Sequence, residues 1–152
     1  MMSSRGGAHL LFALTVPFLG LAASPTFGED YVVKAVDEIA LQVNPNAPFP
    51  GQMAVLAGDP SQPGPFVIRF RIPAGTVLAS HSHSSAQHIT VLAGKARVAF
   101  GASEESAAKE VGPGGFVLEP AGTFHTIWVD EDLEADLFAI GPFDWIEENT
   151  QD

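Results

Sequence analysis

Residues 75–94 read GTVLASHSHSSAQHITVLAG, and residues 114–125 read GGFVLEPAGTFH. The first stretch holds two histidines that are two residues apart, so in a strand both side chains point to the same face. The second stretch ends in another histidine, just behind a Pro-Ala-Gly turn. Three imidazoles and one amide oxygen form a donor set that suits a divalent transition metal. The two stretches therefore predict one metal site with the ligands His81, His83, Gln87 and His125.

Short β-strands are indicated on both sides of these stretches. From Phe66 to Ile72 large apolar residues alternate with Val67, Arg69 and Arg71, which is the period of a strand with one buried face. Many short strands with little helical periodicity indicate an antiparallel all-β sandwich or barrel. Residues 103–108 fit a hairpin loop better than a helical turn. The further strands are expected over residues 88–92, 96–100, 109–111, 116–118, 126–129 and 135–140.

Strand alternation also indicates where the metal ligands meet. If the faces that carry them line the interior of one barrel, the imidazoles converge and aliphatic side chains form a dry wall around them. We expect Gly94 to turn a tight hairpin, and Pro120–Gly122 to turn the chain into the barrel. The expected inward faces are Gln87, Ile89 and Val91 on one strand, and His125, Ile127 and Val129 on another.

The spacing of these residues resembles the two signature motifs of the cupin superfamily. The first family motif, Gly-x5-His-x-His-x3–4-Glu-x6-Gly, matches Gly75, His81, His83, Gln87 and Gly94. The second, Gly-x5-Pro-x-Gly-x2-His-x3-Asn, matches Gly114, Pro120, Gly122, His125 and Val129. The resemblance implies an all-β fold, an antiparallel jelly-roll barrel in a single domain, and metal binding. It leaves the reaction open, because cupins include dioxygenases, decarboxylases, isomerases, lyases, storage proteins and sugar-binding modules.

The chain departs from the family pattern at two positions. Val129 replaces the terminal asparagine and is expected to pack in the core. Gln87 replaces the metal-binding glutamate, so a divalent site would carry a charge near +2 instead of +1. Such a site should favour hydroxide, a carboxylate or an enolised diketone. Gln87 is either a ligand through its amide oxygen or a hydrogen-bonding residue behind the ligands.

The N-terminal residues read as a secretory signal. Arg5 precedes a run of apolar residues from Leu10 to Ala22 that is shorter than the roughly 20 residues a membrane span needs. Small residues follow, and cleavage after Gly28 is preferred over cleavage after Ala23. We therefore expect a signal peptide over residues 1–28, a cupin domain over residues 29–152, and a protein exported to the periplasm or the extracellular space.

Composition restricts the partners. The formal net charge of −11 argues against nucleic acid and anionic membrane surfaces. The absence of cysteine excludes disulfides, thiol catalysis and iron–sulfur clusters. The expected partner is a small anionic ligand or substrate. Nucleic acid is not expected as a partner, and neither is a membrane once the signal peptide has been removed. The resemblance further implies a homodimer, with Phe143 or Trp145 at the interface.

Several other polar residues could have either a structural or a functional role. His88 points away from Gln87 and is expected to be an exterior or a hydrogen-bonded core histidine and not a ligand. Arg69 and Arg71 fit a salt-bridged strand face better than an anion site. Glu119 is a candidate general base, but alternation does not force it inward, so no catalytic residue is assigned.

Two functions fit the sequence. One is a metal-dependent enzyme of the dioxygenase, lyase or isomerase type that acts on a small anionic or diketone-like compound. The other is a non-catalytic module that binds a metal ion or a small ligand. The ion is one of Zn, Cu, Ni, Fe or Mn, and loading outside the cytoplasm favours Cu(II), Zn(II) or Ni(II) by affinity.

Overall fold

The computed structural model describes residues 31–101 and 104–148. The predicted signal peptide lies outside these residues. Within them, no helix is long and apolar enough to cross a membrane.

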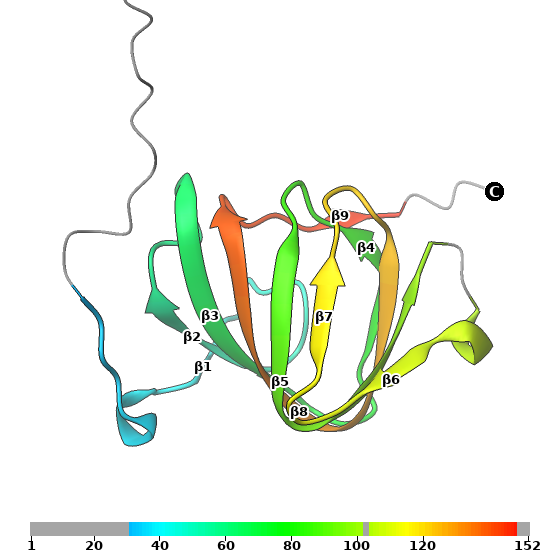
Figure 1. Cartoon of the computed structure of the whole chain (residues 1–152), viewed down its shortest axis with the longest axis horizontal. Coiled ribbons are helices and arrows are strands. Elements are labelled where there is room, and N and C mark those ends of the chain that lie inside the picture. Colours follow the sequence, from blue (N-terminus) through cyan, green and yellow to red (C-terminus); the bar gives the residue numbers. More distant parts are fainter. Residues whose placement is uncertain (1–30, 102–103, 149–152) are drawn as a thin grey trace, which may run out of the picture.

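The described chain is almost entirely β-strand, and all its strand pairings are antiparallel. The predicted all-β jelly-roll barrel is therefore confirmed (Figure 1). The strands are β1 (Gln42–Val43), β2 (Gln52–Ala57), β3 (Gly64–Ile72), β4 (Val77–Ser82), β5 (Gln87–Phe100), β6 (Lys109–Val111), β7 (Phe116–Glu119), β8 (His125–Gly141) and β9 (Ile146–Glu147). Two short 3-10 turns are η1 (Val36–Glu38) and η2 (Glu105–Ala107).

Two long strands, β5 and β8, organise the barrel. They pair with each other along most of their length, and β8 also pairs with β3 and β4. The other neighbours of β5 are β6 and β7, which do not pair with each other. Both long strands bend at the bottom of the view in Figure 1, so each contributes to two walls. The segment between β5 and β6 joins two antiparallel partners, as expected of a hairpin loop, and it contains the short 3-10 turn η2.

Gly94 does not turn a hairpin, and that prediction was wrong. It lies inside β5, at a bulge in the pairing with β8, with φ of +76°. A Cβ at Gly94 would lie 2.1 Å from the carbonyl oxygen of Asp132. The glycine therefore lets β5 bend past β8, where a hairpin would have ended the strand.

This geometry predicts that Gly94→Ala destabilises the fold more than Gly75→Ala. Both residues have positive φ, but a Cβ at Gly75 meets nothing within 4 Å. Gly75→Ala should cost about 1–2 kcal/mol from backbone strain alone. Gly94→Ala adds a backbone clash of about 1–3 kcal/mol. Urea unfolding of both variants measures the difference, and equal costs would contradict the tight approach.

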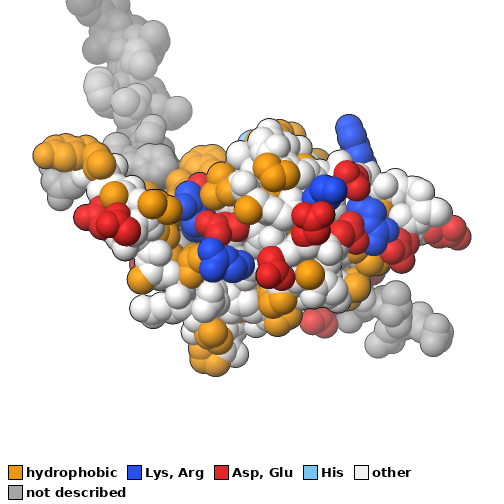
Figure 2. All heavy atoms as spheres, turned by 90° about the horizontal axis from the view of Figure 1, so that it is seen from below, with side chains coloured by type: hydrophobic (Ala, Val, Ile, Leu, Met, Phe, Trp, Pro, Cys, Tyr) orange, Lys and Arg blue, Asp and Glu red, His pale blue; other side chains and the backbone are white. Residues whose placement is uncertain are grey.

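The core follows the predicted alternation of β3. Phe66 and Ile68 are fully buried, whereas Arg69 and Arg71 face outward and pair with Asp136 and Glu134. The interpretation of this face as salt-bridged is thus confirmed. Figure 2 shows basic and acidic side chains lying beside each other on the face of the molecule that is seen from below. Further pairs of the exterior are Lys95 with Glu131 and Arg97 with Asp130 and Glu105.

Candidate metal centre

The structure brings the three predicted histidines together. His81 lies in β4, His83 follows its last residue, and His125 begins β8, where it pairs with His81. Their exposed fractions are 2%, 4% and 0%. One ring nitrogen of each histidine lies within 4.8 Å of the others, so these residues could hold a metal ion.

Backbone carbonyls fix the tautomer of each histidine. A carbonyl oxygen only accepts, so the Nδ1–H of His81 donates to Ala79 at 2.7 Å. In the same way His83 donates to Asp144 at 2.6 Å, and His125 to Thr123 at 3.0 Å. Each neutral ring therefore keeps its lone pair on Nε2. Such hydrogen bonds behind the ring orient histidine ligands in metal sites.

Burial favours the neutral form of two of the rings. It lowers the pKa of His81 to about 3, and it also lowers the pKa of His83. Burial lowers the pKa of His125 too, but contact with the Glu119 carboxylate and the Thr123 carbonyl outweighs it and raises the pKa overall. His81 and His83 are thus neutral, as metal ligands must be.

Glu119 is the site residue that the sequence did not place. Its side chain is 2% exposed, and its Oε2 lies 3.3 Å from Nε2 of His125 and 3.9 Å from Nε2 of His83. Glu119 Oε1 and His125 Nε2 have no hydrogen-bond partner. In β7 the exposed residues are Phe116 and Leu118. Alternation in the sequence would have turned the more apolar Phe116 and Leu118 inward, so no local signal placed Glu119 in the interior.

Gln87 lies opposite Glu119 in the barrel interior. The two residues are partners in the β5–β7 register, and both are 2% exposed. The structure places the Gln87 side chain in the barrel interior, as alternation predicted. Its role as a metal ligand stays a prediction. Val129 is buried in the core, as expected for a packing position.

Aromatic side chains cover the histidines. The Trp145 ring stacks on His81 with centroids 3.4 Å apart and planes 9° apart. Phe143 lies 5.5 Å from His83, and Phe49 lies 6.2 Å from Trp145. Phe143 and Trp145 pack against the core, because β9 pairs with β4 and draws their segment across the histidines. Their predicted place at a dimer interface stays a prediction.

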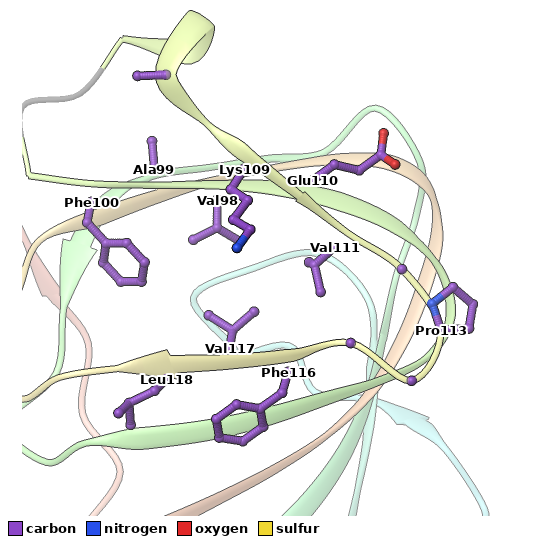
Figure 3. A pocket seen from close by; sticks show the side chains of 14 residues that line it. Val98, Ala99, Phe100, Lys109, Glu110, Val111, Pro113, Phe116, Val117 and Leu118 are labelled. Atoms are coloured by element: carbon purple, nitrogen blue, oxygen red, sulfur yellow. The ribbon is translucent and has the colours of Figure 1, made fainter.

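A small cavity of about 30 Å³ lies among apolar side chains of the interior, and Gln87 and Glu119 are its polar lining residues. None of the three histidines lines it, but Glu119 and Trp145, which contact them, do. A larger hollow of about 880 Å³ lies between β6 and β7, where Val98, Val111 and Val117 line it (Figure 3). None of the histidines lines that hollow. His88 lies outside the barrel near Phe116 and Phe138, in the exterior one of its two expected positions.

The fold and this cluster agree with the comparison to known families. The chain matches the ChrR cupin-like domain over residues 39–144, more than half of its length. The protein belongs to the ChrR cupin-like family. The resemblance to cupins that the two motifs indicated is thereby confirmed, and this cupin carries its three histidines at the motif positions. The comparison with curated proteins found no match.

Solved cupin structures share the fold. KdgF from a Halomonas species is 22% identical, with a TM-score of 0.55 over 74% of this chain and 95% of that one. A variant of oxalate decarboxylase from Bacillus subtilis is 18% identical, with a TM-score of 0.53 over 78% of this chain and 31% of that one. A variant of salicylate 1,2-dioxygenase from Pseudoaminobacter salicylatoxidans is 15% identical, with a TM-score of 0.52 over 60% of this chain and 26% of that one. At these identities the likeness concerns the fold alone.

Proposed function

We propose that this cupin binds one divalent transition metal through His81, His83 and His125, and that it is a metal-dependent enzyme for a small anionic or diketone-like compound. One observation carries the proposal: three buried imidazoles each bring one ring nitrogen within 4.8 Å of the other two, with every Nδ1 held by a backbone carbonyl. Buried polar atoms normally have partners, and a metal ion would supply one for all three.

The residues around the histidines suit a small ligand. A bound divalent ion acts as a Lewis acid toward ligand oxygens. The neighbouring cavity has mostly apolar walls, and Gln87 offers an amide there for hydrogen bonding. A cavity of about 30 Å³ holds little more than one water molecule. A ligand would therefore enter by displacing the cover formed by Phe49, Phe143 and Trp145.

The small cavity also favours a second candidate function, a non-catalytic module that holds the metal itself. In such a module no small ligand has to reach the metal, so the aromatic residues over the histidines would not need to move. The two candidates separate in a screen of the metal-loaded protein against small carboxylates, keto acids and diketones, with oxygen uptake and product mass recorded. Turnover of any compound that depends on His125 supports the enzyme, and binding of metal without turnover across the set supports the module.

Metal binding at this site should quench Trp145. Ions such as Cu(II) and Ni(II) quench an indole that lies near them, and Trp145 stacks directly on His81. Trp128 lies on the exterior beside Arg97, 5.9 Å from its guanidinium carbon. Titration of Trp128→Phe with Cu(II) should therefore remove most of the remaining emission at one equivalent. The matched variant Trp145→Phe should keep its emission, and equal quenching of both would place the ion elsewhere.

We also propose that the protein is exported and binds its metal outside the cytoplasm. Export through the predicted signal peptide would load the site with Cu(II), Zn(II) or Ni(II), because these ions bind nitrogen donors more tightly than Mn(II) or Fe(II). Elemental analysis of protein purified from its native compartment tests this, and iron or manganese alone would contradict it. A homodimer is also proposed, and sedimentation of the metal-loaded protein measures it.

A further inference from the structure

Glu119 is a buried carboxylate without a conventional partner. It is the one acidic residue among the buried polar side chains of residues 31–101 and 104–148. Its ion pairs in that part of the chain involve His83 and His125, and no lysine or arginine there pairs with it. A buried carboxylate is costly unless a positive charge or hydrogen bonds compensate it. Glu119 Oε1 has no hydrogen bond.

The histidines cannot provide that charge in the form that binds metal. The carbonyls of Ala79, Asp144 and Thr123 hold the Nδ1 protons, so the Nε2 atoms of the neutral rings carry lone pairs. Oε2 of Glu119 then faces the lone pair of His125 Nε2 at 3.3 Å. Two lone pairs repel at this distance unless a proton or a metal cation lies between them, and in the neutral, metal-binding form of His125 no proton is available. The arrangement has the donor types and the charge that a divalent ion requires.

The position of Glu119 explains why Gln87 is tolerated. The two residues are direct partners across β5 and β7, so their side chains enter the barrel from neighbouring positions on the same face. One is an amide and the other a carboxylate, and both line the small cavity. A carboxylate on either strand would give the centre one negative charge.

We propose that Glu119 supplies the anionic group of the metal centre, in the place that Gln87 leaves neutral. This inference rests on the proposed metal site. It changes the expected charge of a loaded divalent centre from near +2 to near +1. The preference for anionic ligands that Gln87 alone would cause is therefore reduced.

The test is the affinity of four metal-free proteins for Co(II) and Zn(II), measured by chelator competition. Glu119→Gln should weaken both affinities by about 10- to 100-fold, the range that residues supporting a metal site typically contribute. The double variant Gln87→Glu/Glu119→Gln returns the carboxylate to β5 and should recover affinity to within a few-fold of the wild type. The control Glu131→Gln removes an exposed acid that pairs with Lys95, and it should leave the affinity unchanged.

A second readout separates charge supply from packing. The visible spectrum of Co(II) bound to Glu119→Gln should differ from that of the wild type. Because the variant lacks the carboxylate charge, its spectrum should also shift at lower azide concentrations than the wild-type spectrum does. Thermal unfolding of the metal-free proteins shows whether each variant is folded before loading.

Each outcome decides the inference. Loss of affinity in Glu119→Gln and recovery in the double variant support it. Unchanged affinity in Glu119→Gln overturns it and leaves the three-histidine site intact. Loss without recovery also overturns it, since Glu119 would then act only by holding His125. If the wild type itself binds no metal, the proposed function fails first, independently of Glu119.

Discussion

His125→Ala should abolish stoichiometric metal binding. His125 is fully buried, pairs with His81 across β4 and β8, and supplies one of three converging nitrogens. Residues that only support metal ligands already contribute about 10- to 100-fold to affinity, so loss of a ligand should exceed about 100-fold. Calorimetric titration of the metal-free protein with Zn(II) measures this loss, with the fold of the variant checked by near-ultraviolet circular dichroism.

The matched control is His88→Ala. His88 is also an imidazole near aromatic rings, but it lies on the outside of β5, between Phe116 and Phe138. The His88→Ala variant should bind one equivalent of Zn(II) with wild-type affinity. Equal loss in both variants would mean that the histidines act through folding and not through coordination.

Phe66→Ala should cost about 3–5 kcal/mol of unfolding free energy, which is a large part of the stability of a small domain. Phe66 is 0% exposed on the inner face of β3, and its ring packs edge-on against Phe143 at 6.3 Å. Removing the ring leaves a cavity that the barrel walls cannot fill. Urea unfolding of the metal-free protein is the appropriate measurement, because bound metal would add its own stabilisation.

Phe116→Ala serves as its control. Phe116 is 59% exposed on the outer face of β7, so its loss should cost less than about 1 kcal/mol. The comparison holds the residue type constant and changes only the face of the barrel. Similar costs for both variants would contradict the inside–outside assignment of the strands.

Local pattern predicted most of the barrel. The alternation from Phe66 to Ile72 predicted the buried face of β3, because side chains in a strand point to opposite sides in turn. The same rule placed His81 and His83 on one face and His88 outside. The hairpin predicted at Gly94 was wrong because a glycine with positive φ occurs both in hairpin turns and in β-bulges. Only the pairing with the partner strand distinguishes the two. β5 and β8 were both expected as shorter pieces.

The local sequence pattern also could not predict which aromatic side chains lie over the histidines. Trp145 and Phe143 lie in a segment without regular periodicity, so no face could be assigned to them. Their position depends on β9, whose pairing with β4 joins residues far apart in the chain. A long-range pairing of this kind leaves no mark on the residues beside it in sequence.

The sequence by itself determined the fold class, the inner faces of β3, β5 and β8 and the identity of the three histidines, because these follow from periodicity and from donor chemistry. Only the tertiary structure decided that Glu119 joins them. Within β7, the more apolar pair, Phe116 and Leu118, faces outward, while Val117 and Glu119 face inward. The register that pairs Glu119 with Gln87 sets this choice, and register is a property of two strands together.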